Sequence, residues 1–407
     1  MTLRDSAATG SGERPGNTRG LGAGTERRSR IYFLDYLRAG LVSLVILHHT
    51  AITYGAIGSW YYTEPSTGPG AALLSLFTNF NQAWFLGCFF LISGYLSPAS
   101  FDRKGPRQFL KDRLIRLGIP LVIFFFVIDP ITAYIAFSHL PASQVIAAGF
   151  ALPLTFNWQF FVNAVSTGPL WFVEMLLIFE FGYAFLRVAR NGVKMQGEKE
   201  RPFPSYRSIA IFILLLALTA YLLRAIVPID AEALGFPSIF DLPQYLSFFI
   251  VGTVAARGDW LRRMPSSMAN RFFVMALIGS ATLLPLAIIG TDVTSLGWGS
   301  LLGYGSLSSA IYSLWDSAFA VGMSMFAISF FRSRFDSPGR LWKIFSQDFY
   351  AAFILQALVI VIVAAVLLSS VSLGSLPKFG LAAAIILPLT WGAAYLVRKL
   401  PFADRIL

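Results

Sequence analysis

The first residues able to do chemistry are an arginine and a histidine within one apolar stretch. Arg38 and His49 stand eleven positions apart in a run that begins at Leu34. In an α-helix this spacing places them within about 20° of one face and about 16 Å apart along the axis. An arginine can hold a phosphate, and an imidazole can accept a proton from a reacting hydroxyl. The pair suits a long anionic ligand, with a phosphate at Arg38 and a reactive tip at His49, the expected catalytic base.

Glu174 is the first candidate for a partner of His49. It lies about five residues inside another apolar stretch, at a depth similar to that expected for His49. A buried carboxylate beside an imidazole can fix its tautomer and stabilise the imidazolium that forms on proton abstraction. At the same level, Asn81, Gln82 and Trp171 could supply polar contacts to an acceptor. Hydrogen bonding between packed helices is the alternative interpretation of the two amides.

A basic cluster precedes the third apolar stretch and ends in Arg113 and Arg116. These two arginines are one helical turn apart, which predicts that they face the same way and can grip phosphates in a bidentate manner. We therefore expect Arg38, Arg113 and Arg116 to bind an anionic donor at one mouth of the protein. Anchoring of a cytoplasmic loop is the alternative explanation, and it covers most of this cluster.

These residues must be positioned by membrane-spanning helices. The 407-residue chain is 56% hydrophobic and only 13% charged, against about 25% charged in an average soluble domain, and its mean hydropathy is +0.65. Its apolar residues fall in blocks of roughly 20, the length that crosses a hydrocarbon core. The sequence predicts an all-α, polytopic membrane protein with about ten spans, near 33–55, 75–97, 117–138, 169–189, 208–227, 243–256, 271–290, 307–331, 347–368 and 379–398.

The distribution of positive charge predicts the topology. Of the 32 Lys and Arg residues, 29 lie in the two ends and in alternate loops between the apolar blocks. Cytoplasmic loops collect such residues, so both termini are expected on the cytoplasmic side. Residues 1–30 then form a disordered basic tail, 31–400 one membrane domain and 401–407 a short cytoplasmic tail. The stretch 144–163 is interrupted by Pro153 and Asn157 and is expected to be a re-entrant or interfacial outer loop.

Several other classes of site find no support in the sequence. The chain has no Walker loop, no Gly-x-Ser-x-Gly motif and no cluster of metal-ligand residues, so no metal is expected. Its single cysteine, Cys88, excludes an intramolecular disulfide. Although the net charge is +11, the positive residues lie between apolar blocks, and no nucleic-acid partner is expected. The partners that remain are membrane lipids and small or lipid-linked substrates.

The order of motifs along residues 31–400 resembles that of the integral-membrane acyltransferase 3 family. The resemblance rests on Leu34-Asp35 before the Arg-x10-His pattern of Arg38 and His49, and on four further motifs in the same order. These are Phe89-Phe90-Leu91-Ile92-Ser93-Gly94-Tyr95, Arg113-x-x-Arg116-Leu117, Pro120 and Trp171-Phe172. Within the family, the chain resembles the branch of osmoregulated periplasmic glucan succinyltransferases.

The resemblance implies an enzyme that moves an acyl group, such as an acetyl or succinyl group, from a cytoplasmic acyl-coenzyme A. The acceptor would be a hydroxyl of a glycan, lipid or small molecule, and the enzyme would lie in a bacterial-type inner membrane. Acyl-coenzyme A would be a co-substrate, with no permanently bound cofactor. One departure matters: where many members have a late histidine, this sequence has Gln356, in Tyr350-Ala-Ala-Phe353-Ile-Leu-Gln356.

Two other functions are compatible with parts of the sequence. Ten spans with His, Glu and Asp inside them also suit a transporter or exporter with a proton relay. The chain shows no inverted repeat relating its two halves, and its phosphate-suited cluster lies on one side only, both of which favour the acyltransferase. A non-catalytic membrane scaffold would leave the polar groups at matched depth unexplained.

Overall fold

The computed structural model describes most of the chain and divides it into two units, Met1–Ile31 and Tyr32–Leu407. The expected tail 1–30 lies outside the described residues, so the helices and contacts below all belong to the second unit. Residues 402 and 407 of the expected C-terminal tail are also outside them. The described residues are 31–190, 201–229, 231, 233, 235–289, 303–337, 339–401 and 403–406.

The described part of the chain is helical and contains no β-strand, only an isolated bridge between Ala233 and Phe236. The prediction of an all-α membrane protein is therefore confirmed. The N-terminal half contains α1 (Tyr32–Thr53), α2 (Pro69–Gln82), α3 (Phe85–Arg113), α4 (Ile119–Ile123), α5 (Asp129–Phe137), α6 (Ala142–Ala147), α7 (Trp158–Ala164) and α8 (Trp171–Ala189). The C-terminal half contains α9 (Tyr206–Ile226), α10 (Leu242–Gly258), α11 (Trp260–Arg263), α12 (Ser266–Ile289), α14 (Leu307–Arg334), α15 (Arg340–Val361), α16 (Ser375–Arg398) and α17 (Ala403–Ile406).

Each of the ten expected apolar windows falls on helix, with one break that the sequence did not predict. The window 75–97 is divided between α2 and α3, because the chain leaves helical geometry at Trp84, whose φ is −142°. Gln244 of α10 occupies this break, where its amide nitrogen donates to the carbonyl oxygen of Ala83 at 2.8 Å. The expected cytoplasmic loop 98–116 is also largely helical, since α3 continues to Arg113 through a kink at Gly105.

Among the described residues, seven helical segments are long and apolar enough to cross a membrane. One of them, Pro69–Phe137, covers two of the expected windows, whereas α1 and α8 are not among the seven. These two helices carry the ionisable residues on which the sequence analysis focused, including His49 and Glu174. The count of ten and the side of each terminus remain predictions. Neither α6 nor α7, in the expected outer loop, is long enough to cross a membrane, with 6 and 7 residues.

Two π-helical turns interrupt the third expected window, and prolines explain them. A proline has no N–H to donate to the carbonyl four residues earlier, which for Pro120 is that of Arg116 and for Pro130 that of Phe126. Both carbonyls belong to π-helical turns, Leu114–Gly118 and Phe124–Ile128. Such single turns often occur at functional sites. Here the first of them begins directly after Arg113 and contains Arg116, the two arginines that end the basic cluster.

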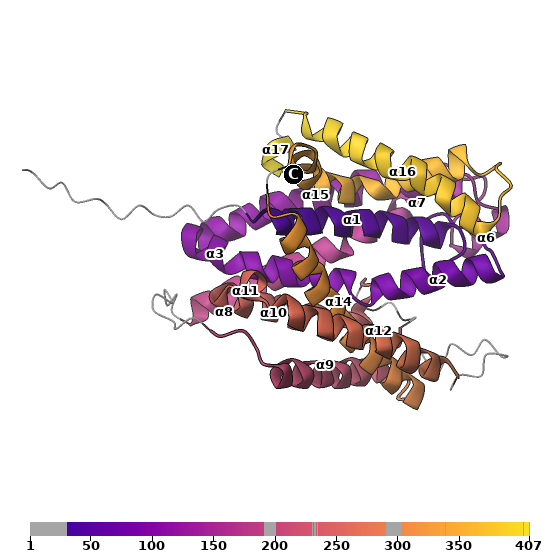
Figure 1. The fold of residues 1–407 in the computed structure, drawn as a ribbon. Helices are drawn as coiled ribbons and strands as arrows, with labels where there is room; N and C mark the ends of the chain where they lie inside the picture. Colours follow the sequence, from indigo (N-terminus) through magenta and orange to yellow (C-terminus); the bar gives the residue numbers. More distant parts are fainter. Residues whose placement is uncertain are drawn as a thin grey trace, which may run out of the picture. The chain divides into compact units, whose positions relative to one another are not determined.

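Helix packing around the site brings together segments that are distant in sequence (Figure 1). Helix α1 lies against α15 and α14, α3 lies against α10, and α12 lies against α14. The contact between α1 and α15 joins segments about 300 residues apart in sequence. In Figure 1 the long helix α16 lies next to α15, on the side of the bundle away from α9.

Candidate functional site

His49 lies on α1 where α15 and the loop 54–68 meet. Its ring nitrogen Nδ1 is 3.1 Å from Oε1 of Gln356 on α15. One face of the imidazole is covered by the indole of Trp60, with ring centroids 3.9 Å apart and planes inclined by 13°. The side chain is half-buried, so the ring is held on two sides and still accessible. The orientation of the imidazole is therefore fixed by a hydrogen bond and a ring stack.

The expectation that Arg38 and His49 share one helix face agrees with their neighbours. Both residues contact α15, since the Arg38 guanidinium lies 5.6 Å from the ring centroid of Phe349 and His49 meets Gln356. Phe349 and Gln356 are seven residues apart, two turns of the same helix. Arg38 also lies 3.6 Å from Asp35 on its own helix. The α1 face that carries the candidate chemistry is therefore bordered by α15 along its length.

His48 has a different environment, as its rotation of about 100° from His49 predicts. Its ring stacks on Phe85 with centroids 5.2 Å apart and is perpendicular to the ring of His49 at 5.5 Å. It is only 7% exposed. No hydrogen-bond partner of its Nδ1 is found in the described part of the chain. His48 is thus a packed neighbour of the candidate base.

The loop between α1 and α2 holds Trp60 in place by polar contacts to two other elements. Glu64 forms an ion pair with Lys378 of α16 at 2.5 Å, and its backbone N–H donates to the carbonyl oxygen of Thr53 at 2.7 Å. Ser66 forms a hydrogen bond with Ser375, at the start of α16. The loop is therefore fastened to both the end of α1 and the start of α16.

Tyr61, next to Trp60, fastens the same loop to α5. Its hydroxyl donates to the buried carboxylate of Asp129, which also accepts from the backbone N–H of Ser166 at 2.8 Å. Burial and the Asp129 carboxylate raise the pKa of Tyr61 well above its usual value, so the hydroxyl keeps its proton and remains a donor. Gly168 approaches closely here, with a φ of +44°, and a Cβ at this position would collide with the Tyr61 hydroxyl.

The two arginines of the basic cluster do not share an environment. Arg113 forms an ion pair with Glu180 of α8 at 3.1 Å and lies 4.9 Å from the ring centroid of Phe109. Arg116 is exposed. Arg116 itself lies in the π-helical turn Leu114–Gly118, which begins directly after Arg113. A π-helical turn winds by less per residue than an α-helix, so the two side chains diverge more than their spacing in an α-helix predicts. The prediction of one bidentate phosphate clamp on this helix face is not supported by the geometry.

The expected pairing of His49 with Glu174 is not formed in the described structure, because Gln356 contacts the imidazole nitrogen instead. Glu174 is half-buried in the first turn of α8. Within the described residues its carboxylate has no hydrogen bond or ion pair with His49. Sequence reasoning missed Gln356, a neutral residue 307 positions away, although it stands where the resemblance leads one to expect a histidine.

Two of the three expected acceptor contacts meet around Tyr245 of α10. The amide nitrogen of Gln82 lies 3.3 Å from the Tyr245 hydroxyl and 3.3 Å from the Asp241 carboxylate. The Trp171 ring lies 5.9 Å from the ring of Tyr245. Asn81 is buried, and its amide nitrogen has no hydrogen-bond partner in the described part of the chain. Gln82 is thus committed to a protein contact, which agrees with the alternative interpretation of this amide.

Gln82 belongs to a buried ionic network that sequence reasoning did not assemble. Arg224 of α9 donates to Asp241 at 2.6 Å, to Asp316 of α14 at 2.7 Å and to Ser313 at 3.0 Å. Arg224 is 1% exposed and both carboxylates are buried. A signal was present in the sequence, since Arg224 is one of three cations outside the basic loops and Asp316 is an acid inside a predicted span. Their pairing could be found only from the fold.

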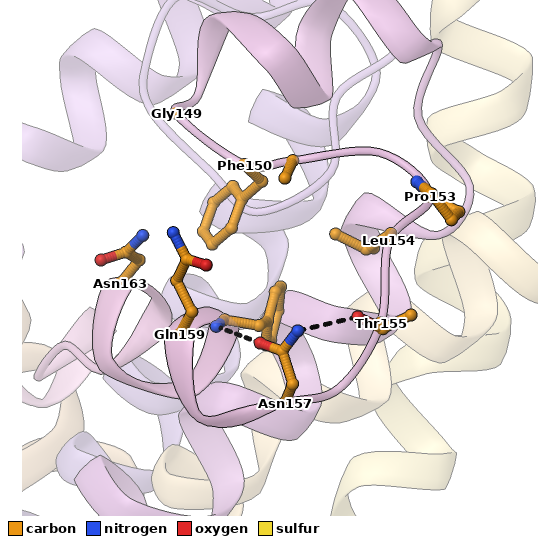
Figure 2. Close-up of a pocket in the computed structure, with 10 residues that line it drawn as sticks. Gly149, Phe150, Pro153, Leu154, Thr155, Asn157, Gln159 and Asn163 are labelled. Carbon is orange, nitrogen blue, oxygen red and sulfur yellow. Dashed lines mark hydrogen bonds between the residues drawn. The ribbon is translucent and has the colours of Figure 1, made fainter.

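Figure 2 shows a separate pocket in the segment that connects α6 to α7 and in α7 itself. Asn157 caps α7 by accepting from the Phe160 N–H at 2.8 Å and donates to Thr155 at 2.9 Å. The pocket contains none of the residues expected to act in catalysis, donor binding or acceptor binding, although Pro153 and Asn157 of the expected outer loop line it. It has a volume of about 40 Å³ and is lined by Gly149, Phe150, Ala151, Pro153, Leu154, Thr155, Asn157, Gln159, Phe160 and Asn163.

A polytopic helical protein with a positioned imidazole in its first helix agrees with the class that the motif order suggested. Residues 31–396 match the acyltransferase domain of the acyltransferase 3 family. The chain belongs to this family. The interpretation of the sequence as a membrane acyltransferase is thereby confirmed at the level of the family.

Particular relatives are similar over part of the chain. Glucans biosynthesis protein C of Shigella dysenteriae serotype 1 (strain Sd197) is 27% identical over 237 residues, 56% of this chain and 58% of the relative. The protein of the same name from Escherichia coli O1:K1 has the same identity and coverage, and that of Escherichia coli K12 (DH10B) is 26% identical over 235 residues. The chain thus spans little more than half the length of these relatives. No solved structure matches it.

Proposed function

We propose that this protein transfers an acyl group from a cytoplasmic acyl-coenzyme A to a hydroxyl of a glycan, lipid or small molecule, with His49 as the catalytic base. The observation that carries the proposal is the environment of His49. Its imidazole is half-buried in a helix of the membrane domain, with one ring nitrogen held by Gln356 and one face covered by Trp60. An imidazole held in this way has one nitrogen left for proton transfer.

The chemistry needs one base and one acyl group. His49 takes the proton of the acceptor hydroxyl, and the hydroxyl oxygen attacks the carbonyl carbon of the thioester. A C–O bond forms and the C–S bond breaks, and the departing thiolate receives the proton from the imidazolium. The products are an ester and free coenzyme A. No further co-reactant is required.

The donor phosphates would bind near Arg38 and Arg116. Arg38 lies on the His49 face of α1, about 16 Å along the helix axis, a distance comparable with the reach of a pantetheine arm. Arg116 is exposed at the end of the basic cluster, whereas Arg113 already shares its charge with Glu180. We therefore assign donor contact to Arg38 and Arg116 first and regard Arg113 as a support of that region.

On the acceptor side, Asn81 is the best placed of the expected contacts because its buried amide nitrogen has no hydrogen-bond partner among the described residues. Gln82 and Trp171 both contact Tyr245 and would support this region without binding the acceptor themselves. Glu174 remains a candidate for the acidic partner of the imidazolium after a change of side-chain position. The relatives are named for glucan biosynthesis, which makes a glucan in a bacterial inner-membrane setting the first acceptor to test.

The test uses purified protein and a panel of acyl-coenzyme A thioesters, with release of free thiol as the readout. His49→Ala should reduce turnover by about 10²- to 10⁴-fold, because a general base contributes that much, while the protein folds and still binds the donor. His48→Ala should be much milder, since that ring packs on Phe85. Near-normal turnover by a well-folded His49→Ala protein would refute the mechanism and favour the transporter.

A further inference from the structure

Two N–H donors lie beside the His49 ring, and neither has a hydrogen-bond partner in the described part of the chain. One is the Gln356 amide Nε2, on a side chain that is 0% exposed, and the other is the Trp60 indole Nε1. A buried donor without a partner is destabilising, and proteins rarely leave one in that state. Because both side chains also contact the candidate base, the missing acceptor is best sought in a ligand.

The Gln356 amide has two ends with different consequences. Its Oε1 faces Nδ1 of His49 at 3.1 Å. A carbonyl oxygen can only accept, so Nδ1 must carry the proton, and the lone pair is then on Nε2 of the ring. The other end of the amide is the donor without a partner among the described residues. Gln356 can therefore set the tautomer of His49 and still offer an N–H to a second group.

We propose that Gln356 and Trp60 bind the carbonyl oxygen of the acyl group while Gln356 holds His49 in its Nδ1–H tautomer. This inference rests on the proposed acyl transfer and adds the residues that stabilise its intermediate. When the acceptor oxygen attacks, the thioester carbonyl oxygen becomes an alkoxide, and fixed N–H donors stabilise that charge. The alkoxide then collapses, the C–S bond breaks, and both donors return to a neutral ester carbonyl.

The kinetic test removes one donor at a time. Trp60→Phe keeps an aromatic ring over His49 but lacks the indole N–H, and Gln356→Met keeps the shape of the side chain but lacks both ends of the amide. Trp60→Phe should lower kcat by about 10²-fold, the typical loss for one oxyanion donor, and Gln356→Met by at least as much, since it also loses the acceptor of the Nδ1 proton. Because the contacts strengthen in the transition state, kcat and kcat/KM should fall together. Trp158→Phe, at a tryptophan that is 76% exposed, is the matched control.

A second measurement does not depend on activity. The chain has three histidines, so imidazole ¹⁵N NMR spectra can be assigned with the His48→Asn and His139→Asn variants. His49 should carry its proton on Nδ1 in the wild type and in Gln356→Glu, which keeps an acceptor, and should shift toward the Nε2–H tautomer in Gln356→Met. An Nε2–H form of His49 in the wild type would overturn the tautomer assignment, because the amide would then face the ring with its other end.

The outcomes separate this inference from the function on which it rests. Wild-type kcat in well-folded Trp60→Phe and Gln356→Met proteins, with an inactive His49→Ala, would refute the oxyanion site and leave the acyl transfer standing. An active His49→Ala would instead refute the proposed function. If Gln356→Met does not fold, Gln356→Glu and Trp60→Phe decide the question, since each removes one donor and retains the shape.

Discussion

Arg113 and Arg116 are alike in sequence and unlike in structure. The carboxylate of Glu180, whose side chain is only 2% exposed, has Arg113 as its ion-pair partner and also accepts from Ser97 at 2.7 Å. A carboxylate at this depth is stable as an anion only with such partners. Arg116 has an exposed side chain, and its charge is available to a ligand. The first arginine is therefore structural and the second is the better candidate for function.

Replacement of each arginine by alanine should separate these roles. Arg113→Ala leaves Glu180 buried and unpaired and should lower the stability by about 3–5 kcal/mol. Arg116→Ala should leave the thermal unfolding midpoint unchanged and raise the donor KM roughly tenfold, the loss of one charge-assisted contact. Thermal unfolding in detergent and thiol-release kinetics measure the two effects. The double variant Arg113→Met/Glu180→Gln should recover most of the stability, and a stable Arg113→Ala protein would contradict the assignment.

The sequence predicted individual site residues only where helix geometry was sufficient. The common face of Arg38 and His49 depends on their spacing within one helix, and both residues do contact α15. The partner of His49 could not be predicted in this way. Gln356 is 307 positions away, and nothing in a single apolar helix tells which of its polar residues will face another helix. Glu174 was chosen by depth alone, and depth does not determine the side of the bundle.

The contact between α3 and α10 depends on two glycines, one on each helix, that face the backbone of the opposite helix. A Cβ on Gly94 would collide with the carbonyl oxygen of Phe249, and a Cβ on Gly252 would collide with that of Leu91. Small residues let helix backbones approach closely in membranes, where apolar burial gives no drive for helix association. This close contact also places α10 against the break between α2 and α3, where Gln244 donates to Ala83.

Gly94→Ala should therefore lower the stability by about 1–3 kcal/mol, because the added methyl group must push two helices apart. Gly182→Ala is the matched control, since a Cβ at this position of α8 would have no heavy atom within 4 Å. It should be neutral or stabilising by about 0.5–1 kcal/mol, the helix preference of alanine over glycine. Thermal unfolding midpoints in one detergent compare the two. Equal midpoints would show that the α3–α10 contact tolerates the methyl group.

The elements themselves were largely predictable from the apolar windows, because a membrane imposes both helix and length. The windows could not predict a break inside one of them or the true end of a helix. Hydropathy does not distinguish a continuous helix from one broken at Trp84, since it averages over the window and the apolar residues on both sides outweigh Asn81 and Gln82 before the break. It also treats the basic segment after residue 97 as a loop, although α3 continues through it to Arg113.

The three cations outside the basic loops are all paired within the membrane domain. Arg38 lies by Asp35, Arg224 by Asp241 and Asp316, and Lys378 by Glu64. A cation with an acidic partner contributes little net charge to its side of the membrane. The exceptions to the charge pattern are thus explained by the fold, and the pattern of the remaining 29 Lys and Arg residues keeps its meaning for topology.

Both termini should accordingly be cytoplasmic. Thr2→Cys and Arg405→Cys should react with an impermeant maleimide only after cells are permeabilised, whereas Thr67→Cys, at an exposed position of the loop 54–68, should react in intact cells. The native Cys88 is the single cysteine of the chain and is buried, which keeps the background low. Labelling of residue 2 or 405 in intact cells would contradict the topology.

The indole of Trp60 over the imidazole also affects how much of the thioester is hydrolysed by water. A thioester beside an activated base can lose its acyl group to water instead of to the acceptor, which wastes a high-energy bond. The ring stacked at 3.9 Å keeps water from one face of His49, and the ion pair of Glu64 with Lys378 holds the loop that carries it. In the proposed reaction, the loop 54–68 would set the fraction of acyl groups lost to hydrolysis. Weaker attachment of this loop would raise that fraction.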